Sequence, residues 1–213
     1  MINKISLSLL WITFVIYAFI FAPPNNPNTL DLIKNLSTGS FTGINPYIIT
    51  LFNLMGILPM MYSAFLIIDS KGQKIPIWLF LIGSFFFGAF ALIPYLILRE
   101  NNPTFSTEKN WLIKLVDSRI LGLILTIITL ILIIFGISQG DWKDFILQWQ
   151  NSRFINVMTI DFCLLSLLFP FLLKDDLTKR GLNSNKLFWI ISFIPLFGTL
   201  IYLCFRPSLP EQK

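Results

Sequence analysis

The 213-residue sequence contains no histidine, and this absence excludes several kinds of chemistry. Histidine-box di-iron sites, bis-histidine haem, histidine-bound pigments, histidine zinc sites and a histidine general base all need a side chain that the chain lacks. Charged residues are also scarce, at 13%, whereas an average soluble domain has about 25%. Because so few charged side chains cannot cover the surface of a soluble fold, we expect a membrane protein.

Other catalytic patterns are missing as well. Cys163 and Cys204, the only thiols, lie within apolar runs and form no CxxC pair, which predicts inert buried thiols. The sequence has no phosphate-binding loop and no GxSxG motif. The net charge of +5 lies in short connections, where contact with anionic lipid explains it more simply than nucleic acid. The sequence therefore favours a protein without enzymatic activity, metal or nucleic-acid partner.

Six apolar runs are long enough to cross a hydrocarbon core of about 30 Å as helices. They cover residues 5–22, 47–68, 77–98, 120–138, 157–173 and 187–205. In lipid only a helix satisfies its own backbone groups. We therefore predict an all-α polytopic bundle of about six transmembrane helices, forming one integral membrane domain over residues 1–213. Pro23 and Pro24 stand where a signal peptidase would need small residues, so we expect the first run to be a retained anchor.

An amphipathic segment follows the fourth run, where Gly140 ends one helix and Asp141 can cap the next. In that next helix four apolar side chains recur at i, i+3, i+4 and i+7, namely Trp142, Phe145, Ile146 and Trp149. This spacing predicts a helix over residues 142–154 that lies flat on the membrane surface. Anchoring between two spans is its plainer role, and a docking face for a partner is the alternative.

Asp161 is the one carboxylate inside a predicted span, and such a costly placement marks a candidate functional site. It lies four residues past Val157, roughly 6 Å into the span, on the face that carries Arg153 and Arg206. Three interpretations remain open. The carboxylate pairs with one of these arginines or bonds a neighbouring helix, it contacts a ligand, proton or pigment, or the span boundary is misplaced.

Charged residues also alternate between the fifth and sixth runs, and we predict a solvated turn there. This turn would contain Lys174, Asp175, Asp176, Lys179, Arg180 and Lys186. With six spans, seven basic residues would lie on the face of the two termini and nine on the other face, which does not fix the orientation.

Five short stretches resemble a family of uncharacterised integral membrane proteins of cyanobacteria and plastids. They are Pro27-Asn28-Thr29-Leu30, Gly43-Ile44-Asn45-Pro46, Gly72-Gln73-Lys74-Ile75-Pro76, Gly88-Ala89-Phe90-Ala91-Leu92-Ile93-Pro94-Tyr95 and Asp161-Phe162-Cys163-Leu164-Leu165. This resemblance covers most of the chain. It implies a thylakoid or plasma membrane of a photosynthetic organism, and it brings no established chemistry.

The C-terminal third is also similar to the family of the plant membrane protein required for neoxanthin formation. The similarity rests on Asp161, residues 176–181, Ile194-Pro195-Leu196-Phe197-Gly198, Tyr202-Leu203 and Arg206. This chain lacks the histidine that precedes the aspartate in that pattern, and its spacing from aspartate to glycine is longer. The similarity implies a carotenoid as the ligand.

Three hypotheses follow, and the third is transport of a small solute. The first is a non-enzymatic protein that assists assembly or stability of pigment–protein complexes in a photosynthetic membrane, through the face around Trp142. The second is a protein that binds or modifies a carotenoid or other isoprenoid lipid, with Asp161 as its polar contact and some of the 22 phenylalanines lining the pocket. We expect bilayer lipid and photosynthetic complexes as partners, and bound carotenoid or lipid in place of a cofactor.

Overall fold

The computed structural model of the chain describes residues 2–105, 108–182 and 184–210. All regular secondary structure in these residues is helical, which confirms the all-α fold class. Four helical segments are long and apolar enough to cross a membrane. They are Lys4–Phe21, Pro46–Gly72, Arg119–Gln139 and Arg153–Lys179. The predicted count of six spans is not confirmed, because the third and sixth apolar runs are each broken in two.

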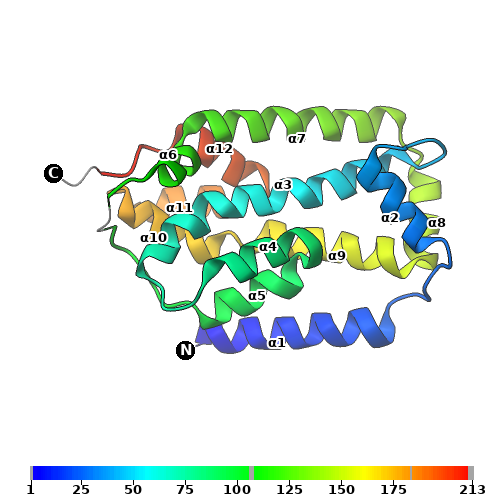
Figure 1. Cartoon of the computed structure of the whole chain (residues 1–213), viewed down its shortest axis with the longest axis horizontal. Helices are drawn as coiled ribbons and strands as arrows, with labels where there is room; N and C mark the ends of the chain where they lie inside the picture. Colours follow the sequence, from blue (N-terminus) through cyan, green and yellow to red (C-terminus); the bar gives the residue numbers. More distant parts are fainter. Residues whose placement is uncertain (1, 106–107, 183, 211–213) are drawn as a thin grey trace.

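The first half of the chain consists of a long helix, a short surface helix, a second long helix and a hairpin of two short helices (Figure 1). The elements are α1 (Ile2–Ile16) with the π-helical turn η1 (Tyr17–Phe21), α2 (Thr29–Thr38), α3 (Pro46–Asp69) with η2 (Ser70–Gly72), α4 (Ile77–Phe87) and α5 (Ala89–Leu98).

The second half repeats this order after the connecting helix α6 (Trp111–Asp117). Its elements are α7 (Arg119–Gln139), α8 (Trp142–Asn151), α9 (Arg153–Leu168) continued by α10 (Pro170–Lys179), α11 (Asn185–Ser192) and α12 (Phe197–Phe205). The long segments Pro46–Gly72 and Arg153–Lys179 both have 27 residues. We call the separation in sequence between their first residues, Pro46 and Arg153, the repeat offset. The two halves run in the same direction through the bundle (Figure 1).

The two broken runs form hairpins that do not cross the bundle. The run over 77–98 turns back at Gly88, and the run over 187–205 turns back at Pro195 and Leu196. The backbone reverses through positive φ, +51° at Gly88 and +64° at Leu196. Both hairpins begin and end at the same end of the molecule, and their tips reach its middle (Figure 1). We call this the hairpin end, and the opposite one the α2–α8 end.

The local sequence explains where the elements of the α2–α8 end begin. The Asn45 side chain accepts a hydrogen bond from the N–H of Tyr47 and caps α3, with Pro46 in the first turn. Asp141 caps α8 through the N–H groups of Lys143 and Asp144, as the sequence predicts. The predicted surface helix over 142–154 is shorter in the structure, because α8 ends at Asn151 and residue 153 already opens α9.

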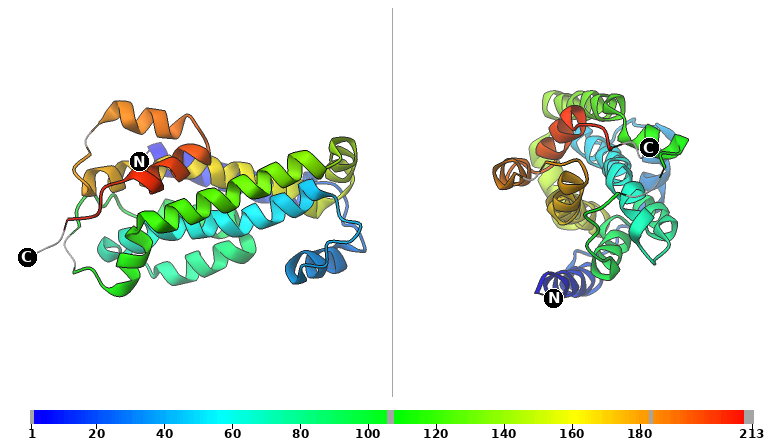
Figure 2. Two further views of the ribbon diagram at one scale, coloured as in Figure 1. Left: turned by 90° about the horizontal axis from the view of Figure 1, so that it is seen from above. Right: turned by 90° about the vertical axis from the view of Figure 1, so that its left-hand side faces the viewer.

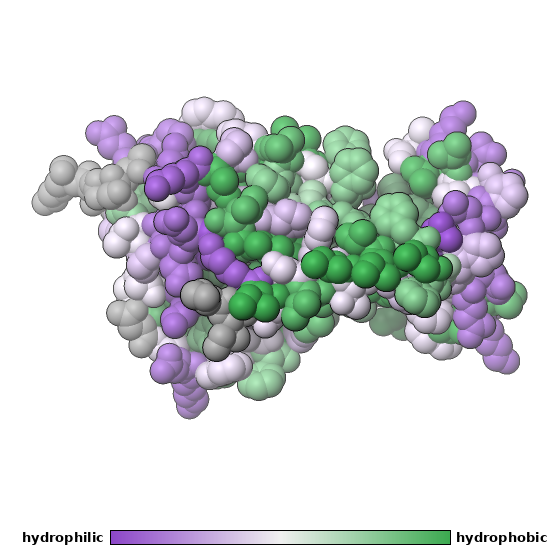
Figure 3. All heavy atoms as spheres, turned by 90° about the horizontal axis from the view of Figure 1, so that it is seen from below, coloured by the Kyte–Doolittle hydropathy of each residue, from purple (hydrophilic) through white to green (hydrophobic). Residues whose placement is uncertain are grey.

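The core lies along α3 and α9, and the two other long helices lie outside them (Figure 2). In the most apolar part of each helix, 67% of residues are buried in α3, but only 17% in α1 and 22% in α7. On the face that Figure 3 shows, apolar side chains form a belt across the middle of the molecule, and hydrophilic ones gather at both ends. This distribution is that of a protein whose belt faces lipid tails.

Because of the two hairpins, most basic residues lie at one end of the molecule. Of the 15 lysines and arginines in the described part of the chain, three belong to the α2–α8 end, namely Lys34, Lys143 and Arg153, and 12 belong to the hairpin end. Lys213, the sixteenth, is outside the described residues. With six spans, the basic residues would be almost evenly divided between the two faces of the membrane. In the structure each broken run returns to the end where it began, so most basic residues lie at the hairpin end.

Candidate functional site

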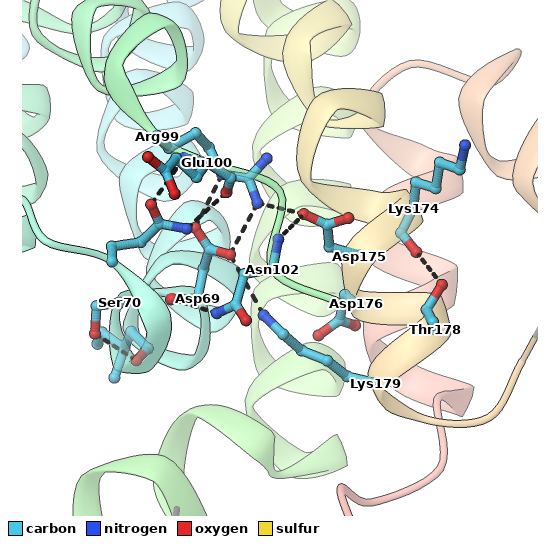
Figure 4. A network of polar contacts seen from close by, with 12 residues as sticks. Asp69, Ser70, Arg99, Glu100, Asn102, Lys174, Asp175, Asp176, Thr178 and Lys179 are labelled. Atoms are coloured by element: carbon cyan, nitrogen blue, oxygen red, sulfur yellow. Dashed lines mark hydrogen bonds and ion pairs between the residues drawn. The ribbon is translucent and has the colours of Figure 1, made fainter. Parts of the chain in front are cut away.

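An ion-pair cluster joins the helices at the hairpin end. The Arg99 guanidinium lies against the Asp69 carboxylate at the end of α3, with Nε donating to Oδ2 and Nη2 to Oδ1 over 2.9 Å each. Tyr95, one turn earlier on α5, donates its hydroxyl to the same carboxylate over 3.0 Å. Lys179 approaches Asp69 from α10 (Figure 4). One carboxylate therefore receives donors from both halves of the chain.

A second cluster repeats this pattern later in the chain. Asp176 on α10 accepts a hydrogen bond from the Tyr202 hydroxyl over 2.6 Å and one from Arg206 Nη1 over 3.4 Å. In both clusters the tyrosine follows the aspartate by 26 residues and the arginine follows it by 30. Asp176 follows Asp69 by the repeat offset, so the two clusters are spaced like the two long segments.

Each of the two arginines also reaches into the opposite half. Arg99 Nη1 donates to the carbonyl oxygen of Phe171 over 3.1 Å, and Arg206 Nη1 donates to that of Ala64 over 3.2 Å. Phe171 follows Ala64 by the repeat offset, as Arg206 follows Arg99. Reciprocal contacts between equivalent positions are produced by an approximate two-fold axis. The chain therefore consists of two parallel repeats related by an axis along the bundle, an arrangement also found in some transporter folds.

The carboxylates of these clusters are all engaged. Asp175 bonds Arg99 and the N–H of Asn102 (Figure 4). Asp117 bonds Arg180, Lys109 and the N–H of Leu209. No group of three side chains suited to hold a metal ion occurs among the residues that the structure describes. The clusters therefore fasten helices together and present no free carboxylate for chemistry.

The solvated turn predicted between the fifth and sixth runs is wrong for four of its six residues, although Lys174 and Lys186 are exposed. Asp175, Asp176, Lys179 and Arg180 are only 3–8% exposed and lie on or next to the last turns of α10. A buried charge is tolerated when it is paired and hydrogen-bonded, and each of these four has a partner of opposite charge. The pairing was not predicted, although Tyr-x-x-x-Arg occurs at both 95–99 and 202–206 and was a signal that could have revealed it.

Asp161 lies at the tip of the first hairpin. Its Oδ1 accepts a hydrogen bond from the N–H of Ala89, the first residue of α5, over 2.6 Å. The positive end of the α5 dipole faces the carboxylate there. Gly88 approaches so closely that a β-carbon at this position would collide with the carboxylate group. Asp161 thus satisfies a backbone donor that the break between α4 and α5 leaves free.

The span that carries Asp161 is longer than predicted, because it begins at Arg153 instead of Val157. Asp161 therefore lies about 12 Å along the helix, deeper than the roughly 6 Å expected from the sequence. The residue is 6% exposed. A neighbouring-helix hydrogen bond, one of the interpretations left open, is what the structure shows.

A cavity of about 440 Å³ lies beside the Asp161 carboxylate. Its wall is largely aromatic and includes Phe19, Phe52, Phe85, Phe86, Phe87, Phe90 and Phe154. Phe86 and Phe87 are 77% and 65% exposed and belong to the lipid-facing belt, so the cavity opens towards the bilayer. Asp161 and Arg153 are the only charged side chains among its described lining residues.

The three residues predicted to surround this site are only partly brought together. Arg153 lines the same cavity as Asp161, but its Nε donates to the carbonyl of Pro23 over 3.0 Å, and the described residues show no ion pair between the two. Arg206 lies at the hairpin end, 2% exposed, in the second cluster. Pairing of Asp161 with an arginine is therefore not observed.

The apolar face of α8 packs mainly against its own chain. Phe145 is buried at 8% exposure, in a cluster with Ile48 and Ile155, and Ile146 and Trp149 pack against the same cluster. Trp142 is 57% exposed and contacts the ring of Tyr47 edge to face. Of the four residues predicted to dock a partner, Trp142 alone has most of its side chain free.

Comparison of the chain with models of protein families, with curated proteins and with solved structures found no match.

Proposed function

We propose that this chain binds an isoprenoid lipid, such as a carotenoid, at the tip of the first hairpin. The observation that carries the proposal is a buried carboxylate, Asp161, in the wall of an aromatic cavity that opens to the bilayer. A ligand that enters from lipid must be mostly hydrocarbon. A hydroxyl group at its end would find in Asp161 a strong acceptor in surroundings of low dielectric constant.

The ring-rich wall fits the hydrocarbon part of such a ligand. Planar polyenes and substituted rings pack well against phenylalanine side chains, and the phenylalanines bury large apolar areas at little entropic cost. Residues from η1, α2, α3, α4, α5 and α9 meet in this wall. The cavity therefore lies between the two halves of the chain, the place where ligand sites of duplicated membrane proteins commonly lie.

The test separates the charge of Asp161 from its capping role. Asp161→Asn keeps an oxygen that can accept the N–H of Ala89 but removes the charge that holds the ligand hydroxyl. The variant and the wild type are purified in mild detergent, extracted with organic solvent and analysed by liquid chromatography and mass spectrometry. We expect a retained isoprenoid alcohol in the wild type and about tenfold less in Asp161→Asn.

The matched control is Asp31→Asn, which neutralises an exposed carboxylate on α2 and should leave the retained lipid unchanged. Wild-type protein that carries no isoprenoid, or equal amounts in both proteins, would refute the proposal. In a deletion strain, accumulation of a carotenoid precursor would further indicate that the ligand is modified and not merely held.

Transport of a small solute has one observation in its favour. Two broken hairpins at equivalent positions of two repeats are typical of transporter binding sites. The wall of the cavity at the first tip is nevertheless mostly phenylalanine, so it offers a polar solute few hydrogen-bond partners besides Asp161 and Arg153. Loss of a metabolite or ion flux in Asp161→Asn would favour transport over lipid binding.

Assistance to pigment–protein complexes stays a prediction from the sequence. Its docking face would be centred on Trp142, since the rest of that face packs within the chain. Affinity purification should then recover photosystem or antenna subunits with the wild type and lose them with Trp142→Ala. Recovery of the protein alone at high purity would dispose of this role.

A further inference from the structure

The tip of the second hairpin corresponds to the tip of the first, position by position. Pro195 follows Gly88 by the repeat offset. The first tip faces Asp161, a residue of the opposite half. Leu54 precedes Asp161 by the repeat offset and lines the cavity of the second tip. The second tip therefore faces a hydrocarbon side chain at the position where the first tip faces a carboxylate.

The second tip closes its backbone without help from a side chain. The N–H of Phe197 donates to the carbonyl of Pro195 over 2.7 Å, around Leu196 with its positive φ. The first tip instead leaves the N–H of Ala89 to Asp161. Because the second tip needs no carboxylate as a cap, an apolar residue at position 54 is compatible with its fold.

A second cavity, of about 490 Å³, lies at this tip between α3, α7, α9 and the α11–α12 turn. Its wall includes Leu54, Phe162, Ser166, Leu167 and Leu196, and no charged side chain is among the described residues that line it. Leu167 is 56% exposed on the lipid-facing belt. The cavity is therefore accessible from the bilayer, as the first one is.

Ser166 is the group in this wall that lacks a partner. The residue is 7% exposed, and its Oγ has no hydrogen bond within the part of the chain that the structure describes. Helical hydroxyls usually bond the carbonyl one turn earlier, as Thr159 does to Ile155 in the same helix. A buried hydroxyl without a partner is costly, and a hydrogen-bonding group of a ligand in this cavity would remove that cost.

We propose that the second tip binds a second, electrically neutral membrane lipid. Its hydrocarbon chain fills the space beside Leu54, Phe162 and Leu196, and a carbonyl or hydroxyl oxygen of the lipid bonds Ser166 Oγ. The two repeats thus hold two lipids on opposite sides of the α3–α9 pair, one bonded to a carboxylate and the other to a hydroxyl. This site does not include Asp161, so the proposal of a second lipid site can be refuted without refuting the first, and the reverse.

The probe is a diacylglycerol that carries a photoactivatable diazirine in one acyl chain, in liposomes containing the full-length protein. After illumination, peptide mass spectrometry locates the attachment points. We expect labelling of 162–167 and of the α11–α12 turn that unlabelled diacylglycerol displaces in a saturable manner. Phosphatidylglycerol, which is anionic, should displace it poorly.

Ser166→Ala removes the hydroxyl and keeps the space, and it should weaken displacement by about fivefold. Ser166→Leu fills the space and should abolish labelling at this tip. Ser63→Ala is the matched control, because Ser63 bonds the carbonyl of Met60 on an equivalent helix outside this cavity. Asp161→Asn should leave the labelling of the second tip unchanged.

Labelling that no competitor saturates, or that spreads evenly along the exposed face of α7, would show ordinary boundary lipid and overturn the proposal. Unchanged displacement in Ser166→Ala together with unchanged labelling in Ser166→Leu would overturn it as well. The saturability of the wild type is decisive even if a variant is poorly folded.

Discussion

The ring of Tyr62 stacks on the ring of Phe169, with centroids 4.0 Å apart and planes inclined by 10°. Phe169 follows Tyr62 by the repeat offset, so each residue faces its own counterpart across the centre of the bundle. A residue that contacts its equivalent lies on or beside the two-fold axis. The axis therefore passes between α3 and α9, and the ion-pair clusters and both hairpin tips are arranged around it.

Equivalent positions should respond alike to mutation. Arg99→Ala and Arg206→Ala each remove one cationic partner of a buried aspartate, Asp69 or Asp176, so each should lower the free energy of unfolding by about 3–5 kcal/mol. Thermal unfolding in detergent measures the effect, and Lys71→Gln, an exposed change at the same end, is the control. A large effect at one arginine and none at the other would contradict the two-fold arrangement of the clusters.

Gly88 should tolerate no side chain while Asp161 is present. Gly88→Ala places a β-carbon against the Asp161 carboxylate and also strains a backbone with φ of +51°. We expect a loss of stability of at least about 2 kcal/mol, part of it from the backbone alone. In an Asp161→Ala background the collision disappears and the penalty of Gly88→Ala should fall. Equal penalties in the two backgrounds would show that the close approach is not what requires glycine.

Asp117 should contribute to the loss of folding stability at acidic pH. Burial alone would raise the pKa of Asp117, but the charge and hydrogen bond of Arg180, the N–H of Leu209 and the charge of Arg206 outweigh it and lower the pKa. A carboxylate with a lowered folded pKa stabilises the protein above its unfolded value of about 3.9, and this contribution is lost as pH falls through the folded pKa. Unfolding midpoints measured from pH 7 to pH 3 should therefore fall less steeply in Asp117→Asn, which is already less stable at pH 7. A profile parallel to that of the wild type would exclude this role.

The two hairpins imply a membrane topology that differs from the topology of six spans. Single cysteines at Lys71, Lys114 and Lys143, all exposed, are introduced in a Cys163→Ala, Cys204→Ala background. The bias of basic residues towards the hairpin end places that end in the cytoplasm. A membrane-impermeant maleimide should then label Lys143→Cys in intact cells, and Lys71→Cys and Lys114→Cys only after permeabilisation. With six spans, positions 71 and 143 would share a face and position 114 would lie opposite.

Hydropathy predicted the four spanning segments because length and apolar composition are what a bilayer requires of a helix. It failed for 77–98 and 187–205 because an apolar run that turns back at mid-depth has the same composition as one that crosses. Gly88 and Pro195 were visible, but glycine and proline are common in membrane helices and do not by themselves mark a reversal. The direction of the chain after each break depends on the φ angles at Gly88 and Leu196.

The site was predictable in part. Asp161 stood out because a carboxylate in an apolar run is costly, and it does lie beside the cavity. Its contact with Ala89 could not be predicted, since the break that frees that N–H was itself unforeseen. The charges of Asp175 to Arg180 were misjudged because a local pattern cannot show that Asp69 and Asp117, far away in the sequence, lie against them.

The connection through α6 keeps the two halves in one polypeptide. Two separate copies would have to find one another in the plane of the bilayer, and their pairing would weaken on dilution, whereas tethered halves meet at an effective concentration that dilution does not change. A tether also frees each half from the symmetry that identical subunits impose. A homodimer would carry an acid at both tips or at neither, and only a fused pair can keep Asp161 on one side and Leu54 on the other.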